Sequence, residues 1–258
     1  MLDLLIKNGL AYVDGDFRKC DIAVKDGKIA AVAECGLFGD GDAMRSIEAE
    51  GKYVTPGGID THIHISDPGH ADRETFYTGT LSAAQGGCTT ILEHPISTPP
   101  QYNKEILDNR KRIAADNCVV DYAFYGAAGG QYPEEIVPLS KEGIVAYKSF
   151  LHQAPAGREG EFVGLTLAND AEIMTGMREI AKTGLMMASH AENNDMIVHN
   201  IEEFRAKGWT KPIDHCKSRP AITEYSTVSK LILMAKATGC KLELAHMSTP
   251  ESCELAKQ

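Results

Sequence analysis

The sequence predicts an α/β fold, a TIM (β/α)8 barrel that stops after about six βα units and follows a small β-unit. From about residue 53 onwards, short and nearly continuous apolar runs alternate with segments of helical character. This pattern is typical of buried parallel strands in βα units. The first fifty or so residues instead alternate apolar and polar positions, as half-exposed antiparallel strands do. We expect two domains, residues 1–55 and residues 56–258.

The N-terminal domain is expected to be a small antiparallel β-unit. Residues 21–32 have the sequence DIAVKDGKIAAV, in which Asp26 and Gly27 separate two alternating runs. An Asp-Gly pair in this position favours a tight hairpin turn, because both residues adopt positive φ angles readily. The sequence therefore predicts a hairpin centred on these two residues.

Six strands are expected in the second domain, at the apolar runs near residues 58–65, 89–95, 119–126, 144–150, 185–190 and 241–246. The helices between them begin at capping residues and end at glycines. Asp170 opens one such helix, which ends before Gly184. Thr223 opens another, which ends at Gly239.

The barrel is expected to be truncated. A barrel of this type normally has eight βα units, and six are found here. The last residues, STPESCELAKQ (248–258), look like a helix cap, a proline in the first turn and the start of a helix. We therefore expect a truncated protein or a fragment.

Composition and charge limit the function classes. With 43% hydrophobic and 24% charged residues, the chain is typical of soluble globular proteins, and we expect no membrane role. The N-terminus has no basic region and no small-residue cleavage site, so we expect a cytoplasmic protein. A formal charge of -10 disfavours nucleic acid as a partner, because nucleic-acid binding requires a basic surface. A small neutral or weakly acidic substrate fits better.

The cysteines predict neither a disulfide framework nor a zinc knuckle. There are seven of them, an odd number, and none is spaced as C-x-x-C. We expect reduced, mostly structural thiols at Cys20, Cys35, Cys88, Cys118, Cys216, Cys240 and Cys253.

Four histidines lie at the C-terminal ends of three expected strands: His62, His64, His190 and His246. His62 and His64 are two residues apart, so strand alternation puts both imidazoles on the same side. Catalytic groups of α/β barrels gather at this end of the strands, and neutral imidazole is a good zinc ligand. A packing role explains any single histidine, but packing gives no reason for all four to share this position. We therefore predict a metal site.

Lys148 lies inside the apolar strand IVAYKSF (144–150). A buried lysine is costly to keep charged, so burial favours the neutral amine. A neutral amine can react with carbon dioxide to give an anionic carbamate, which is able to bridge two metal ions. The alternative is a lysine whose amine reaches the barrel mouth or pairs with an acidic side chain. Beside the four histidines, Lys148 is predicted to be a fifth ligand.

Several motifs resemble those of the amidohydrolase superfamily, in its cyclic-amidase branch of allantoinases, hydantoinases and dihydropyrimidinases. The metal motif is PGGIDTHIH at residues 56–64, and the resemblance extends along nearly the whole chain. The other motifs are DPG (67–69), FYTGT (76–80), GGCTT (86–90), SHAEN (189–193), SRPAITE (218–224) and AHMS (245–248). The resemblance implies that residues 1–55 form the N-terminal part of a small β-sandwich beside the barrel.

The resemblance also implies a site for two divalent metal ions, with zinc the first expectation. His62 and His64 would hold the more buried ion. His190 and His246 would hold the more exposed ion, and Lys148, as the N6-carboxylated lysine, would bridge the two.

The activity that this resemblance implies is hydrolysis of a cyclic amide. Hydroxide between the two ions would attack the amide carbonyl, and the ring C–N bond would open. The family's general base is an aspartate after the eighth strand, which is expected beyond residue 258. The chain alone is therefore expected to bind metal poorly and to turn over little or nothing.

Allantoinases are the subgroup that the sequence resembles most. The motifs HISDPG and TILEHPI are similar to theirs, although His94 stands where methionine is usual. Dihydroorotases carry an arginine and an asparagine where this chain has Ser66 and Ile96, so a substrate carboxylate lacks its partner. Hydantoinases and dihydropyrimidinases usually have a tyrosine in place of Gln153. These enzymes stay as alternatives, as does a metal-free scaffold protein related to dihydropyrimidinase.

Two further expectations concern the strand that carries Lys148. Tyr147 faces the opposite side of the sheet and is expected to pack away from the barrel mouth. The next segment, QAPAGREGEF (153–162), departs from every subgroup and is expected to shape a different pocket. The resemblance also implies a homo-oligomer, commonly a tetramer.

Overall fold

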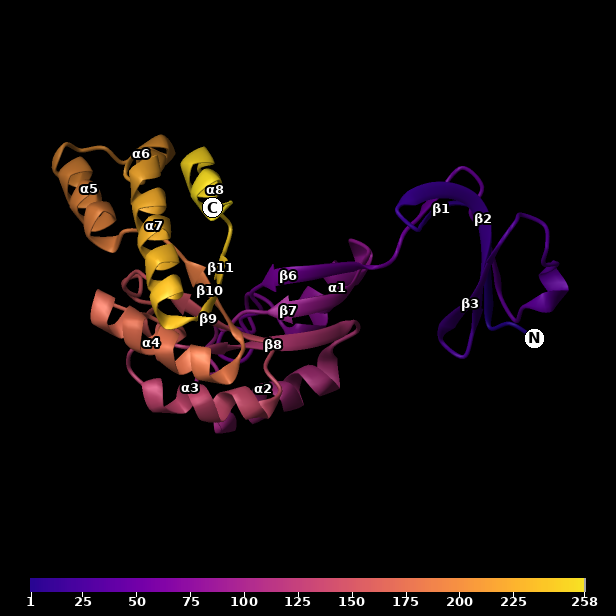
Figure 1. The fold of residues 1–258 in the computed structure, drawn as a ribbon, viewed down its shortest axis with the longest axis horizontal. Helices are drawn as coiled ribbons and strands as arrows, with labels where there is room; N and C mark the ends of the chain where they lie inside the picture. Colours follow the sequence, from indigo (N-terminus) through magenta and orange to yellow (C-terminus); the bar gives the residue numbers. More distant parts are fainter. Residues whose placement is uncertain (258) are drawn as a thin grey trace. The chain divides into compact units, whose positions relative to one another are not determined.

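The chain divides into two units, Met1–Gly58 and Ile59–Gln258, in a computed structural model that describes residues 1–257 (Figure 1). The smaller unit is a five-stranded sheet with the order β3-β2-β1-β4, and β5 pairs with β1. Its elements are β1 (Leu4–Val13), β2 (Asp16–Lys25), β3 (Lys28–Ala33), the 3-10 turn η1 (Asp40–Asp42), β4 (Ser46–Glu48) and β5 (Tyr53–Val54).

The expected hairpin in the smaller unit is confirmed. Asp26 and Gly27 join β2 to β3 with φ angles of 52° and 70°, the positive pair that a two-residue type I′ turn requires. The expectation of a wholly antiparallel unit is wrong, because β4 and β5 pair with β1 in parallel. Residues 34–45 carry the chain back to the start of β1, so β4 then runs in the same direction as β1.

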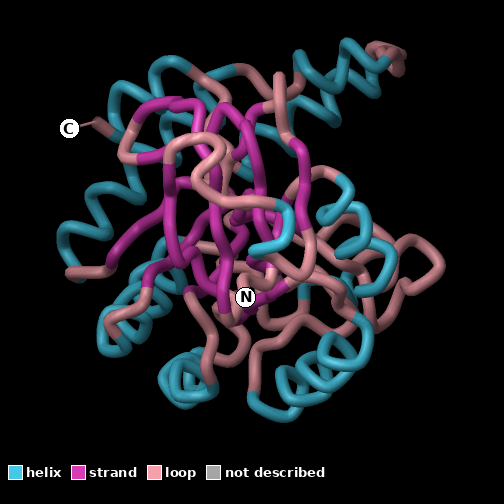
Figure 2. The backbone as a smooth tube through the Cα atoms, turned by 90° about the vertical axis from the view of Figure 1, so that its right-hand side faces the viewer, coloured by secondary structure: helices cyan, strands magenta, loops and turns pink. Residues whose placement is uncertain are grey.

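The larger unit contains a six-stranded sheet in the order β11-β10-β9-β8-β7-β6, and the strands from β7 to β11 pair in parallel. All six predicted strands are confirmed, with each end within two residues of the expected one. Helices follow every strand and lie around the outside (Figure 2), which gives six consecutive βα units of a barrel. The strands are β6 (Gly58–Ile63), β7 (Cys88–Glu93), β8 (Asp121–Ala127), β9 (Ala146–Phe150), β10 (Met186–His190) and β11 (Lys241–Leu244).

The helices begin at caps close to those expected. Asn169, rather than Asp170, caps its helix and accepts a hydrogen bond from the Glu172 N–H, so the expected cap is wrong by one residue. The expectation that Thr223 opens a helix is also wrong, because the helix begins at Ala221 behind Pro220, whose fixed φ suits that position. The helices are α1 (Phe76–Gln85), α2 (Lys104–Asn117), α3 (Pro133–Leu139), α4 (Asp170–Thr183), α5 (Asn194–Ala206), α6 (Pro212–Lys217), α7 (Ala221–Thr238) and α8 (Pro250–Ala256).

The main apolar core lies between the sheet and its helices. Tyr147 is fully buried there, and its hydroxyl donates to the Ile136 carbonyl of α3, so its expected orientation is confirmed. Its neighbour Lys148 projects from the opposite side of β9, as alternation requires. None of the helices within residues 1–257 is both long and apolar enough to cross a bilayer.

Candidate active site

The four predicted histidines lie together at the C-terminal ends of the strands. His62 is in β6, His64 follows it, His190 ends β10, and His246 comes two residues after β11. Ring centroids lie 5.2 Å apart for His62 and His64, and 5.2 Å apart for His62 and His246. The rings of His190 and His246 are 4.8 Å apart. Parallel topology thus brings side chains from three strands into one cluster.

His62 and His64 project from the same side of the strand, as predicted. Ile63, which lies between them, packs on the other side against the core. Burial is the largest of the effects that lower the pKa of His62 to about 4 and that of His64 to about 3, and the charge of nearby Lys148 acts in the same direction. Both imidazoles are therefore neutral at pH 7. Within the described residues, His64 Nδ1 is buried and has no hydrogen-bond partner.

His190 and His246 meet through their ring nitrogens. His190 Nδ1 lies 3.2 Å from His246 Nε2, and His190 Nε2 lies 2.8 Å from Glu192 Oε2. The hydrogen bond from His190 lowers the pKa of Glu192, so this carboxylate is ionised and can only accept. In the neutral imidazole of His190 the hydrogen is then on Nε2, and Nδ1 keeps its lone pair.

Glu224 of α7 fixes the turn that carries His246. The backbone of His246 is left-handed, with a φ of 41°. The Glu224 carboxylate accepts hydrogen bonds from the N–H and hydroxyl groups of Ser248 and Thr249, at 2.7 to 3.1 Å. Burial acts to raise the pKa of Glu224, but hydrogen bonds from Ser252, Ser248 and Thr249 lower it to about 2. The turn is therefore held by an ionised carboxylate.

Lys148 is fully buried, and its Nζ has no hydrogen-bond partner within residues 1–257. Burial lowers the pKa of Lys148 to about 8, although Glu243 acts in the opposite direction. The Nζ atom lies 5.0 Å from the centre of the Phe150 ring, which in turn stacks on His190 at 5.3 Å. The alternative of an amine that reaches solvent or forms an ion pair does not hold in this structure.

No three His, Cys, Asp or Glu side chains within residues 1–257 are grouped as a metal site. Two of the predicted donor atoms, His190 Nδ1 and His246 Nε2, lie within hydrogen-bond distance of each other, and Lys148 Nζ has no partner. The structure thus brings the predicted residues together without a complete shell of donors around one point.

Sequence reasoning missed the residues that support the cluster. His94, noted only as a departure from the resemblance, is fully buried, and its ring stacks on His62 with centroids 3.9 Å apart. Glu192 and Glu224 lie inside the motifs SHAEN and SRPAITE. The one sequence signal for Glu192 is its place two residues after His190. Glu224 carries no such signal, because its partners lie 24 and 25 residues further along the chain.

Two loops beside the cluster are joined by the buried carboxylate of Glu161. One loop comprises residues 66–75 after β6, and the other, residues 153–162, is the segment expected to shape a different pocket. Arg73 Nη1 lies 3.3 Å from both Glu161 oxygens, and Arg158 Nε lies 3.0 Å from Oε1. The hydrogen bonds from Arg158 lower the pKa of Glu161 to about 2. The two loops are therefore linked by an ion cluster.

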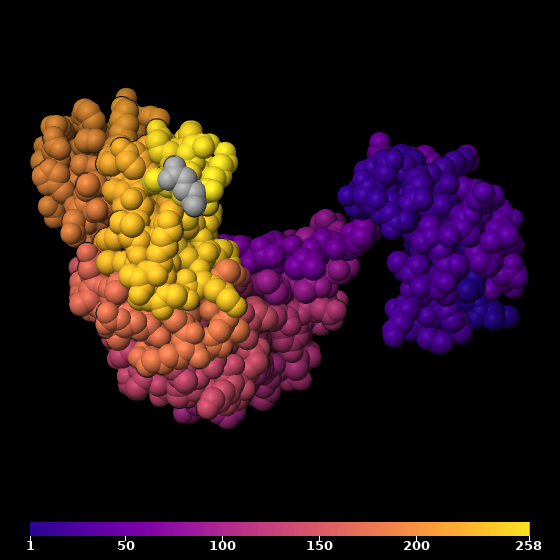
Figure 3. All heavy atoms as spheres, viewed as in Figure 1, coloured from indigo at the N-terminus to yellow at the C-terminus, as the bar shows by residue number. Residues whose placement is uncertain are grey.

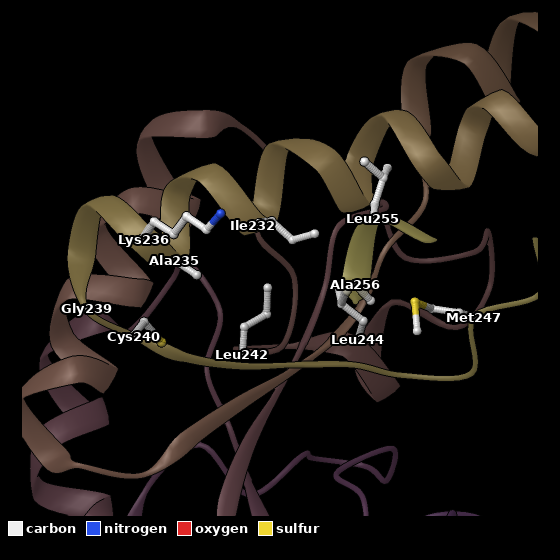
Figure 4. Close-up of a pocket in the computed structure, with 10 residues that line it drawn as sticks. All are labelled: Ile232, Ala235, Lys236, Gly239, Cys240, Leu242, Leu244, Met247, Leu255 and Ala256. Atoms are coloured by element: carbon white, nitrogen blue, oxygen red, sulfur yellow. The ribbon is translucent and has the colours of Figure 1, made fainter. Parts of the chain in front are cut away.

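An apolar groove lies on the other side of β11, between α7 and α8 (Figure 4). The two helices pack side by side at the surface (Figure 3). None of the clustered histidines lines this groove, so it is separate from the candidate site. Its lining residues are Ile232, Ala235, Lys236, Gly239, Cys240, Leu242, Leu244, Met247, Leu255 and Ala256.

A family model described as "Amidohydrolase family" matches residues 53–258, which is most of the chain. This chain belongs to the amidohydrolase family. The match includes every predicted ligand, and it agrees with the motifs that carried the resemblance. It covers all six strands of the sheet, three of which carry the histidine cluster at their C-terminal ends.

Relatives of this amidohydrolase include allantoinases. It is 34% identical over 257 residues to the allantoinase of Desulfitobacterium hafniense, covering 99% of this chain and 55% of the relative. It is 36% identical over 264 residues to the allantoinase of Bacillus licheniformis, covering 98% and 55%. The chain thus spans about half the length of the curated relatives it matches.

Solved structures similar to this amidohydrolase include hydantoinases. The L-hydantoinase (dihydropyrimidinase) of Arthrobacter aurescens superposes with a TM-score of 0.89 at 32% identity, over 99% of this chain and 55% of that chain. A D-hydantoinase superposes with a TM-score of 0.84 at 29% identity, over 99% and 54%. The fold and the cyclic-amidase branch are therefore those that the sequence predicts.

Proposed function

We propose that this amidohydrolase chain binds two divalent metal ions and is part of an allantoinase-like enzyme that hydrolyses a cyclic amide. The single observation that carries the proposal is the pair formed by His190 and His246. Two donors bound to one tetrahedral zinc, each about 2.0–2.1 Å from it, lie about 3.3 Å apart. His190 Nδ1 and His246 Nε2 are 3.2 Å apart, and Glu192 leaves the required lone pair on Nδ1.

The other predicted ligands also have the chemistry that a metal requires. His62 and His64 are neutral, and His64 Nδ1 is a buried acceptor without a partner. In our proposal these two hold one ion, while His190 and His246 hold the other. The buried amine of Lys148, which has no partner, would add carbon dioxide and lose a proton, and the resulting carbamate would serve as an anionic ligand.

The bound ions would supply Lewis acidity and an activated water. The protein's own residues do the rest. Glu192 orients the His190 ring and keeps its hydrogen on Nε2, as carboxylates behind metal-bound histidines do. Glu224 fixes the turn after β11 and so the direction of His246. The low pKa values of His62 and His64 keep protons off their donor nitrogens at neutral pH.

Metal binding by the purified whole enzyme tests the site, because the chain alone is expected to bind metal poorly. Zinc affinity, measured by competition with a chromophoric chelator, is expected to fall at least about 10-fold in His190→Gln and in His246→Gln. The matched control is His199→Gln, at an exposed histidine on α5, which should bind zinc as the unsubstituted enzyme does. Equal affinity in all four proteins would contradict the proposed ligands, as would a whole enzyme that binds less than about one ion.

The substrate class is a small cyclic amide, and allantoin is our first candidate because the curated relatives are allantoinases. Hydantoin and dihydrouracil are the second, because the solved structures are hydantoinases. A ring-opening assay of the whole enzyme should rank allantoin clearly above both. A flat or reversed order would replace the allantoinase assignment with the hydantoinase one. A metal-free scaffold would open none of the three rings, and oligomeric state, expected to be tetrameric, stays a prediction.

A further inference from the structure

A column of three stacked rings stands beside the histidine cluster, made by His62 of β6, His94 after β7, and Tyr125 of β8. The centroids of His62 and His94 are 3.9 Å apart, and the planes of their rings differ by only 3°. On its other face the His94 ring stacks against Tyr125, with ring centroids 3.9 Å apart and ring planes that differ by 24°. Each ring comes from the next strand along the sheet, so the column runs across the strands.

His94 is held rigidly in the middle of this column. Its backbone N–H donates to the Ile63 carbonyl at 2.9 Å, and its Nε2 lies 3.1 Å from the Thr61 carbonyl. A carbonyl only accepts, so Nε2 carries the ring hydrogen. The side chain is 0% exposed. Both hydrogen bonds go to β6, the strand that carries His62, so the two rings are fixed to the same segment of backbone.

The orientation of His94 argues against a role as an additional ligand of the ion that His62 would bind. The lone pair of an imidazole nitrogen lies in the plane of the ring, and a zinc ion sits about 2.0–2.1 Å away in that plane. Two parallel stacked rings direct their lone pairs along parallel planes that do not meet. The proposed ligands are instead tilted, by 72° between His62 and His64 and by 62° between His190 and His246.

We infer that His94 is a positioning residue that fixes the ring plane of His62 by face-to-face stacking, with Tyr125 supporting it from behind. The outer end of the column is itself anchored, because the Tyr125 hydroxyl lies 3.4 Å from Glu243 Oε2. The effect on metal affinity rests on the proposed function, whereas the stacking of His62 is a property of the chain without metal. The two can therefore be tested separately.

Two substitutions separate the ring of His94 from its nitrogens. His94→Phe keeps a flat ring and removes both nitrogens. His94→Gln removes the ring and keeps a donor able to reach the Thr61 carbonyl. A second pair of variants changes the end of the column: Tyr125→Phe keeps the ring, and Tyr125→Leu removes it. This pair tests the inference even if either His94 variant fails to fold.

The first measurement uses the metal-free chain. Protons over the face of an aromatic ring resonate upfield, so the His62 ring protons should be shifted in a proton–carbon NMR spectrum. We expect the shift to persist in His94→Phe and Tyr125→Phe, to be lost in His94→Gln, and to be reduced in Tyr125→Leu. Unchanged His62 signals in His94→Gln would overturn the inference, whether or not the chain binds metal.

The second measurement is the zinc affinity of the whole enzyme. Residues that orient a metal ligand typically change affinity 10- to 100-fold when replaced, so His94→Gln should weaken binding at least about 10-fold. His94→Phe should stay within about 3-fold of the unsubstituted chain. If both His94 variants lost zinc affinity equally and Tyr125→Leu kept full affinity, the nitrogens of His94 would be what matters. That result would overturn the stacking role. Failure of the unsubstituted whole enzyme to bind zinc would count against the proposed function alone.

Discussion

Arg110 Nη2 lies 2.6 Å from Glu93 Oε1, and both side chains are fully buried. The same nitrogen lies 2.6 Å from the Ile65 carbonyl oxygen, and Glu93 Oε1 accepts from the Ile65 N–H at 3.3 Å. Gln101 closes the network, because its amide donates to Glu93 and its oxygen accepts from Arg110. Ile65 directly follows His64, so this ion pair holds the backbone on which the first proposed ligands stand.

Arg110→Met should lower the free energy of unfolding by about 3–5 kcal/mol, because it leaves the Glu93 carboxylate buried without its cation. Urea denaturation measures the loss. Lys104→Met is the matched control, since Lys104 lies on the same helix and pairs at the surface with Asp108 and Glu142. That change should cost less than about 1 kcal/mol. A loss in Arg110→Met no larger than the control's would contradict the structural role of the pair.

Glu224→Gln should destabilise the turn that carries His246, by about 1–2 kcal/mol at pH 7 after allowance for solvent screening. Hydrogen bonds lower the pKa of Glu224 to about 2 from its ordinary value of 4.5. A lowered pKa stabilises the fold above the unfolded value, and this contribution is lost as the pH falls from 4.5 through 2. The gap in unfolding free energy between the two proteins should therefore close over that range. Glu251→Gln, an exposed carboxylate on α8, should show no such closing.

Lys148→Ala should bind zinc much more weakly, and short carboxylates such as acetate or propionate should restore part of the affinity. The buried amine has a pKa lowered to about 8, so a larger fraction is neutral and reactive towards carbon dioxide at pH 7 than for an ordinary lysine. In the control Lys148→Met, an apolar side chain fills the same space. This variant should bind zinc weakly, and carboxylates should not restore its affinity. An alanine variant with full zinc affinity and no response to carboxylate would refute the carbamate.

Gly129→Ala should destabilise the larger unit by about 1–3 kcal/mol. A Cβ at this position would lie 2.6 Å from Gly164 C and 2.6 Å from Leu165 N, which are backbone atoms that cannot rotate away. Gly41→Ala has no atom within 4 Å of the added methyl and serves as the control. Thermal unfolding followed by circular dichroism distinguishes the two, and equal melting temperatures would show that the loop adjusts freely.

The sequence predicts a strand well where burial on both faces leaves a continuous apolar run, as in β9 around Lys148, all five residues of which are buried. It predicts the histidine cluster for a topological reason. Parallel strands end on the same side, so His62, His190 and His246 meet although up to 184 residues separate them. The caps were harder to predict, because adjacent Asn169 and Asp170 are equally good N-cap residues.

Side-chain contacts across the sheet leave no periodic signal in the sequence. The stacking of His94 on His62 joins residues 32 positions apart on neighbouring strands, and alternation indicates the side of the sheet but not the ring angle. The parallel pairing of β4 with β1 was missed for a similar reason. A three-residue strand carries too little pattern to reveal its direction.

Glu161 has a practical consequence for protein engineering. It accepts from Arg158 in its own loop and from Arg73 in the loop after β6, and His70 Nε2 lies 3.5 Å from it. Transplanting residues 153–162 from a relative would leave Arg73 of the other loop without this carboxylate. Transplanting residues 66–75 alone would remove Arg73 and His70, and the nearly buried carboxylate of Glu161 would keep only Arg158 as a partner. Loop grafts between relatives should therefore move both segments together.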